Sequence, residues 1–78
     1  MLISEKRLTQ LARAMSYGRK TAARLNLNIE MQYDPSLNII YFNLDSKQVA
    51  RMYIFDTNTA NDIRDQLITT IEHLTPQD

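Results

Sequence analysis

Apolar residues recur every three or four positions over the first third of the chain, the spacing of an amphipathic helix. The pattern predicts a helix from Ser4 to about Asn26, with Ser4 as its N-cap and Glu5 in a first turn that favours negative charge. Gly18 lies within this helix and allows a kink or a break there. The expected apolar stripe consists of Leu8, Leu11, Ala12, Met15, Ala22 and Leu25.

Beyond this helix the period of the apolar positions changes to two, which is typical of half-buried strands. Residues 27–33 form the first expected strand, and Asp34-Pro35-Ser36 supplies the residues of a turn. Residues 38–44 form the second strand, residues 45–47 a turn, and residues 48–55 the third strand. Short connections of this kind join antiparallel neighbours, so the sequence predicts a three-stranded meander.

A second helical pattern runs from about Thr59 to Leu74 and ends before Pro76. Either Thr57 or Thr59 is a suitable N-cap. The apolar stripe of this helix consists of Ala60, Ile63, Leu67, Ile71 and Leu74. The predicted fold is therefore α+β, in the order α-β-β-β-α, with two helices packed mainly on one face of the sheet and residues 1–78 in a single domain.

Composition excludes several classes of function. The 78 residues include one glycine, one histidine and no cysteine. A glycine-rich phosphate loop, a thiolate nucleophile and a cysteine-ligated metal site are thereby ruled out. No apolar run approaches the length of a membrane helix, and the start of the sequence lacks a secretory signal. We expect a soluble cytoplasmic protein that has no cofactor and no small-molecule substrate.

Charge is unevenly distributed although the formal net charge is zero. Residues 1–26 contain six basic residues and one acidic residue, a net charge of +5, whereas residues 27–78 carry −5. Such a split favours electrostatically steered pairing, either with a second copy or with another protein.

The basic residues of the first helix form one stripe, which we call the basic stripe: Lys6, Arg13, Lys20 and Arg24, flanked by Gln10 and Tyr17. It lies opposite the apolar stripe and runs about 27 Å at ~1.5 Å per residue. Phosphates or an acidic protein surface are suitable contacts. A solvated helix face is the simpler interpretation.

One face of the sheet is expected to carry exposed apolar side chains. The better inward set is Ile40, Phe42, Leu44, Ala50, Met52 and Ile54, because it leaves Asn43 and Arg51 outside. The outward set is then Ile39, Tyr41, Val49, Arg51, Tyr53 and Phe55, which is typical of a contact surface for a homodimer or a partner protein.

Three alternatives compete with this interpretation of the sheet. One helix could cover each face, or a one-residue slip could exchange the two faces. The aromatic residues beside Arg51 could instead stack on unpaired bases, although Glu30 on the neighbouring strand weakens that possibility.

Little in the chain suggests catalysis or metal binding. Asp62, Asp65, Thr69 and Glu72 share the outward face of the last helix without the spacing of a calcium loop, and a solvated acidic face explains them. His73 near the end of that helix favours the helix dipole. We expect no catalytic residue and no metal site.

Two features of the sequence resemble those of nucleic-acid-binding proteins. Residues 11–25 resemble a helix-turn-helix phrase with its turn at residues 16–18, which implies that Arg19, Lys20, Thr21 and Arg24 approach DNA. The unbroken apolar stripe favours one continuous helix instead. The element order is also similar to that of double-stranded-RNA-binding domains, but their lysine cluster corresponds here to the acidic segment 59–65.

The sequence thus predicts a non-enzymatic interaction module, an adaptor, regulator or inhibitor that acts by binding. It would dimerise or dock on a protein partner through the outward sheet residues. The alternative is a nucleic-acid-binding protein that uses the basic stripe.

Overall fold

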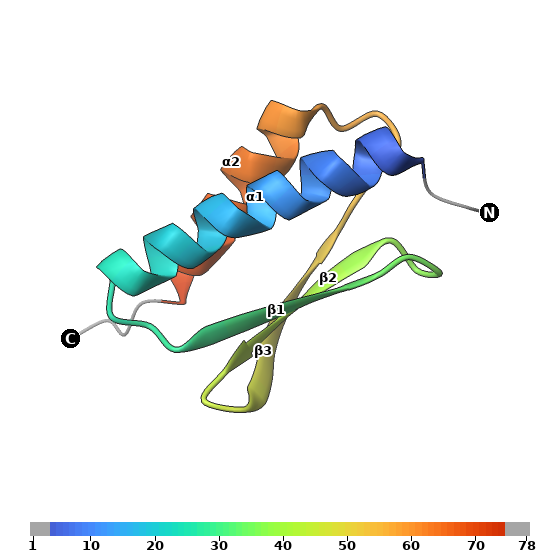
Figure 1. The fold of residues 1–78 in the computed structure, drawn as a ribbon. Helices are drawn as coiled ribbons and strands as arrows, with labels where there is room; N and C mark the ends of the chain where they lie inside the picture. Colours follow the sequence, from blue (N-terminus) through green and yellow to red (C-terminus); the bar gives the residue numbers. More distant parts are fainter. Residues whose placement is uncertain (1–3, 75–78) are drawn as a thin grey trace.

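The computed structural model of this chain describes residues 4–74 and contains two helices and three strands (Figure 1). In chain order these elements are α1 (Glu5–Arg24), β1 (Ile29–Asp34), β2 (Ile39–Leu44), β3 (Lys47–Tyr53) and α2 (Ala60–His73). The α+β class and the predicted order α-β-β-β-α are confirmed.

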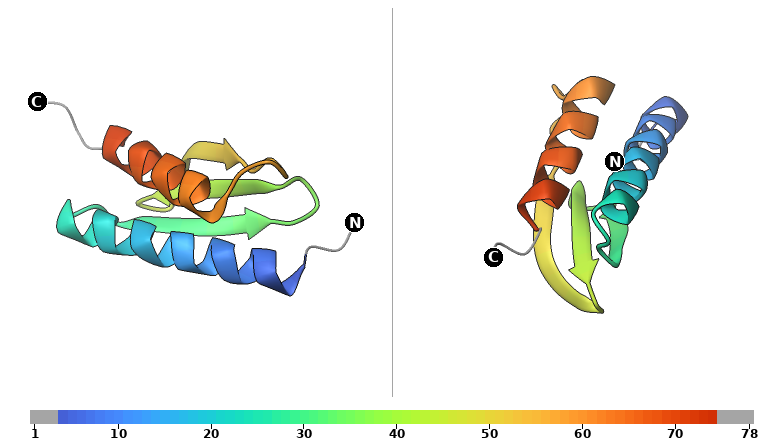
Figure 2. Two further views of the ribbon diagram at one scale, coloured as in Figure 1. Left: turned by 90° about the horizontal axis from the view of Figure 1, so that it is seen from above. Right: turned by 90° about the vertical axis from the view of Figure 1, so that its left-hand side faces the viewer.

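The three strands form an antiparallel sheet in the order β1-β2-β3, the predicted meander. Both helices lie on the same face of this sheet (Figure 2), and they run side by side in roughly the same direction. The alternative with one helix on each face is therefore wrong. The other face, which we call the outer face, has no element over it within residues 4–74.

Both ends of helix α1 are capped: it begins after Ser4, as predicted, and ends at Arg24, two residues before the predicted end at about Asn26. The Ser4 hydroxyl accepts a hydrogen bond from the Arg7 amide at 3.2 Å, as predicted. At the other end Asn26 adopts a left-handed φ of 58°, and the Leu27 amide donates to the Ala22 carbonyl at 2.9 Å. This Schellman arrangement keeps Leu27 out of β1, which begins at Ile29 rather than at residue 27.

No turn interrupts α1 at residues 16–18, so the helix-turn-helix phrase is one continuous helix. Gly18 is buried and faces α2: a Cβ built on it would lie 2.1 Å from Leu67 Cδ2 and 3.0 Å from Ile71 Cδ1. The glycine is thus a point of close helix contact rather than a break. It also centres the buried stripe of α1, which consists of Leu11, Ala14, Gly18, Thr21 and Ala22.

The predicted apolar stripe of α1 is rotated about the helix axis relative to the stripe that is buried. Leu8 and Ala12 are exposed, and Met15 and Leu25 are only partly buried. The cause is Gly18, which contributes no apolar signal to the sequence although it lies against Leu67 and Ile71 of α2.

Helix α2 begins with a capping box. Thr59 accepts a hydrogen bond from the Asp62 amide at 3.1 Å, and the Asp62 carboxylate accepts one from the Thr59 amide at 3.0 Å. Of the two predicted caps, Thr59 is therefore the one that is used.

A two-residue turn joins β2 and β3. Asp45 and Ser46 both have positive φ, 51° and 70°, which is the geometry of a type I′ hairpin turn. It fixes the register of β3 on β2 and hence which side chains reach each face.

The core lies between the sheet and the helices. Its fully buried side chains are Leu11, Ile40, Phe42, Ile63, Leu67 and Ile71, and Met31, Met52 and Ile54 are also buried. Within residues 4–74 no helix has the length and apolarity needed to cross a membrane.

Candidate protein-interaction surface

The strand register determines which side chains point to the outer face. Ile40 pairs with Met52, and Phe42 pairs with Ala50; these residues point toward the helices. The alternating positions Tyr41 and Arg51, which are paired with each other, therefore point outward. The predicted choice of inward and outward sets is correct, and the one-residue slip does not occur.

The edge strand β3 carries the exposed part of this face. Tyr53 is 52% exposed and Phe55, just beyond the end of the strand, is 61% exposed. Arg51 is exposed and Tyr41 is partly buried. Large apolar side chains with this much exposure, gathered at one place, are typical of contact surfaces.

Ile39 corrects one part of the prediction, because it is only 5% exposed although it points outward. It belongs to the central strand and pairs directly with Tyr53. The Ile54 amide donates to the Asn38 carbonyl at 2.8 Å, so the 39–53 pair is of the non-hydrogen-bonded type, in which side chains lie closest. Ile39 therefore packs against its exposed neighbours on this face and offers little accessible surface to a partner.

Val49 is exposed for a different reason. Ala50 pairs with Phe42 and Gln48 pairs with Asn43, which leaves Val49 as the extra residue of a β-bulge. The bulge interrupts the edge of β3, so a further strand could pair regularly only with the second half of β3.

The backbone of Phe55 is held by three hydrogen bonds, and a fourth joins two of its partners. Its carbonyl accepts from the Arg7 guanidinium at 2.7 Å and from the Asn58 amide at 2.9 Å. Its own amide donates to the Asn58 side chain at 2.8 Å, and Arg7 donates to the Asn58 carbonyl at 2.8 Å. The exposed ring thus projects from a fixed backbone, and a preorganised side chain loses less conformational entropy on binding.

Sequence reasoning missed Leu37, which is 58% exposed in the turn between β1 and β2. The neighbouring Asn38 is bonded to Ile54, which places this turn at the same end of the sheet as Phe55. A large apolar residue inside a turn is the signal that could have identified it. We call Leu37, Tyr41, Tyr53 and Phe55 the apolar patch.

The turn that carries Leu37 is built by polar contacts. The Asp34 carboxylate accepts hydrogen bonds from the Ser36 hydroxyl at 2.6 Å and from the Ser36 amide at 2.9 Å, and these bonds lower the pKa of Asp34. Burial raises the pKa of Tyr33, whose hydroxyl donates to the Asn38 side chain at 2.5 Å. Asp34 therefore stays ionised and Tyr33 protonated at neutral pH.

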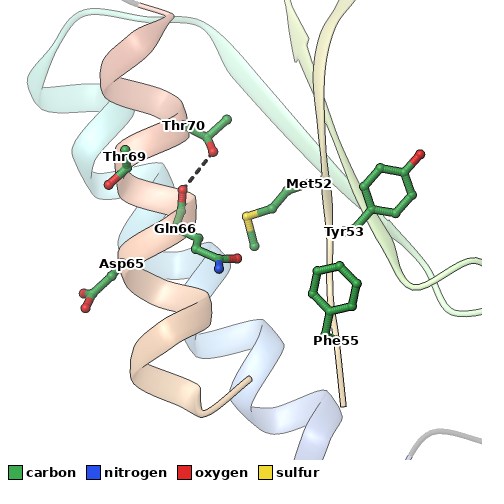
Figure 3. A pocket seen from close by; sticks show the side chains of 7 residues that line it. All are labelled: Met52, Tyr53, Phe55, Asp65, Gln66, Thr69 and Thr70. Carbon is green, nitrogen blue, oxygen red and sulfur yellow. Dashed lines mark hydrogen bonds between the residues drawn. The ribbon is translucent and has the colours of Figure 1, made fainter. Parts of the chain in front are cut away.

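A shallow groove of about 510 Å³ separates α2 from β3 (Figure 3). Met52 points into it from the strand, opposite Gln66 of the helix. Phe55 and Tyr53 border it at the strand side, so the apolar patch continues into the groove. Its full lining is Met52, Tyr53, Phe55, Asp65, Gln66, Thr69 and Thr70.

The basic stripe of α1 is exposed, as predicted, at Lys6, Arg13, Lys20 and Arg24. Tyr17 lies beside it, with its ring centroid 5.6 Å from Lys20 Nζ and 5.7 Å from Arg64 Cζ of α2. Within residues 4–74 none of the four cations of the stripe pairs with a carboxylate, since the one ion pair there joins Arg64 and Asp65 at 3.5 Å. The stripe is distant in the fold from the apolar patch, because it lies on the helices and the patch on the outer face of the sheet.

Two acidic residues of α2 have local partners. Asp62 belongs to the capping box and Asp65 pairs with Arg64. Over residues 4–74 no three His, Cys, Asp or Glu side chains lie close enough together to bind a metal ion. His73 is the last residue of α2, and its Nδ1 lies 2.8 Å from the Thr69 carbonyl oxygen of the same helix.

Comparisons of the chain with protein families, with characterised proteins and with solved structures find no match.

Proposed function

We propose that this chain is a non-enzymatic protein-interaction module that binds a second copy or a partner protein through its apolar patch. The observation that carries the proposal is Phe55: its side chain is 61% exposed although its backbone is held by Arg7 and Asn58. An exposed aromatic side chain on a fixed backbone has the properties of an interface anchor.

Covering the apolar patch contributes a substantial part of the free energy that association requires. Large aromatic side chains bury about 150–250 Å² each, so Tyr53 and Phe55 together leave on the order of 200 Å² uncovered. At roughly 25 cal/mol per Å², covering this area contributes about 5 kcal/mol before the entropic cost of association. A partner with a complementary apolar surface is thereby favoured.

Removing the two exposed rings is expected to abolish association without unfolding the protein. The double variant Tyr53→Ser with Phe55→Ser should weaken binding by ~100-fold or more, since interface anchors contribute about 2 kcal/mol or more each. Its free energy of unfolding should change by less than ~1 kcal/mol, because both side chains are exposed. Solution mass over a concentration series, together with affinity capture of partners, measures the first effect, and denaturant unfolding measures the second.

Tyr17→Ser is the matched control, because Tyr17 is 49% exposed on the opposite side of the molecule. It should leave association unchanged. The proposed function is contradicted if the wild-type chain is a monomer at every concentration and captures no partner that the double variant loses.

The second candidate is nucleic-acid binding, and the unpaired basic stripe is the observation that favours it. Four cations along one helix face would give an affinity that falls with salt, with a log–log slope of about −3.6 for duplex DNA. The acidic residues Asp65 and Glu72 on the neighbouring helix oppose this function, since they carry like charge to phosphate.

Reversing two charges of the stripe tests this candidate. Arg13→Glu with Lys20→Glu should remove any binding to duplex DNA or RNA, whereas Arg19→Glu with Lys47→Glu makes the same change of net charge away from the stripe and should retain most of it. Fluorescence anisotropy over a salt series measures both affinity and slope. A slope near zero, or equal losses in the two variants, excludes the basic stripe.

A further inference from the structure

On the outer face, a negative charge lies on one edge strand of the sheet and a positive charge lies on the other. Glu30 of β1 is exposed and pairs with Asn43 of β2, which gives it the same outward direction as Tyr41. Arg51 of β3 is exposed on the same face and pairs with Tyr41 from the other side. Two strand spacings, about 10 Å, separate the acidic edge from the basic edge, with the apolar Tyr41 between them.

Two copies of this outer face can pair with opposite charges close together if a two-fold rotation relates them. A two-fold axis that runs along β2, between two outer faces, places β1 of one copy over β3 of the other. Gln32, Tyr41 and Arg51 share one level in the sheet, so Arg51 would face Gln32 of the second copy. Glu30 and Asp34 of that copy each lie two residues from Gln32 along the strand, about 7 Å away, which an arginine side chain spans. The Asp34 carboxylate already accepts two hydrogen bonds from Ser36, so the exposed Glu30 is the favoured partner.

We propose that the outer face binds a second copy of this chain, with β1 of each copy over β3 of the other. The inference rests on the proposed function and names the partner of the same surface. Two Arg51–Glu30 contacts, one on each side of the axis, set the orientation, and Tyr41 meets its counterpart at the centre. Each apolar patch is covered at one end of the interface. Aligned packing of two sheets at about 10 Å is a common arrangement for antiparallel sheets with one bare face.

The size of the face sets the expected strength of the dimer. Three strands of six, six and seven residues, spaced by ~4.8 Å and rising ~3.3 Å per residue, give about 300 Å² per copy in projection. Specific interfaces bury about 800 Å² per partner, so this dimer belongs to the weak class, with a dissociation constant in the micromolar range or above.

Pairing of two β3 edges is the competing route to a dimer. The bulge at Val49 restricts regular pairing to the second half of the strand. Edge pairing also leaves Glu30 far from the interface, because β1 is on the other side of the sheet. A charge exchange between Glu30 and Arg51 therefore distinguishes the two arrangements.

The test measures solution mass by sedimentation from about 1 µM to about 1 mM for four variants and the wild type. Arg51→Glu and Glu30→Arg should each raise the dissociation constant about tenfold or more, because each places like charges together. The double variant should return to within about threefold of the wild type. Lys47→Glu is the control: it makes the same change of charge as Arg51→Glu in a residue paired with the inward-directed Leu44, and it should have no effect.

Every other outcome contradicts the proposal, and each of them identifies a different reason. A dimer that tolerates both single variants, or one that the double variant does not restore, uses another surface. A wild-type monomer at all concentrations overturns the proposal but leaves the proposed function standing if a partner is still captured through Tyr53 and Phe55. Circular dichroism of each variant shows that a loss of dimer is not a loss of fold.

Discussion

Gly18→Ala is expected to destabilise the protein, although alanine is the better helix former. The substitution gains about 1 kcal/mol of helix propensity. The new Cβ would lie 2.1 Å from Leu67 Cδ2 and 3.0 Å from Ile71 Cδ1, and both of those side chains are fully buried. Overpacking of this kind costs about 1–3 kcal/mol, so we expect a net loss of up to about 2 kcal/mol, and about 3 kcal/mol or more for Gly18→Val.

Denaturant unfolding measures this effect, and Ala12→Gly calibrates it. Ala12 is exposed in the same helix, so its replacement should cost about 1 kcal/mol through propensity alone. The decisive comparison uses Leu67→Ala, which removes the obstructing methyl groups at a cost of about 2–5 kcal/mol. In the Leu67→Ala variant, the additional substitution Gly18→Ala should raise the free energy of unfolding. Close packing at Gly18 is refuted if the substitution stabilises the otherwise unchanged protein.

Arg7→Ala is expected to cost about 2–3 kcal/mol, because hydrogen bonds that involve a charged group contribute about 1.5–3 kcal/mol. The guanidinium donates to the Phe55 carbonyl at 2.7 Å, to the Asn58 carbonyl at 2.8 Å and to the Gln10 side chain at 3.2 Å. Its loss frees the segment that connects β3 to α2. Arg7→Lys should recover less than half of the loss, since one ammonium group cannot reproduce the planar fork.

Thermal unfolding and amide exchange at Asn58 measure this prediction. A loss of 1 kcal/mol corresponds to a fall of about 4–8 °C in Tm for a domain of this size. Arg13→Ala is the control, because Arg13 is exposed on the opposite side of α1, and it should change stability by less than ~0.5 kcal/mol. Equal effects of the two substitutions would show that Arg7 does not hold the segment.

The fold was predictable because its periodicities are regular. Alternation in β1 to β3 and the 3.6-residue period of α2 identify the elements and the inward set of the sheet. The hairpin turn at Asp45 and Ser46 was also visible as polar residues between two apolar runs. These features are local, and local features are what a single sequence displays.

The features that could not be predicted from the sequence depend on contacts between segments that lie far apart along the chain. Gly18 moves the buried stripe of α1 because α2 lies against it, and no residue near Gly18 in the sequence indicates that neighbour. Arg7 entered the sequence analysis only as one of the six basic residues of the first 26, yet it holds the carbonyls of Phe55 and Asn58. The burial of Ile39 likewise depends on its being in the central strand and opposite Tyr53.

The pairing of the first helix with the last one has a consequence for how this protein is made. Gly18 touches Leu67 and Ile71, which follow it by about 50 residues, whereas the strands pair with their immediate neighbours. While the chain leaves the ribosome, the meander can form early, but its inner face stays uncovered on the side of β3 until α2 has been synthesised. During that interval Met52 and Ile54, which point inward from β3 and its end, lack the cover of α2, so a chaperone that recognises apolar strands is expected to bind there.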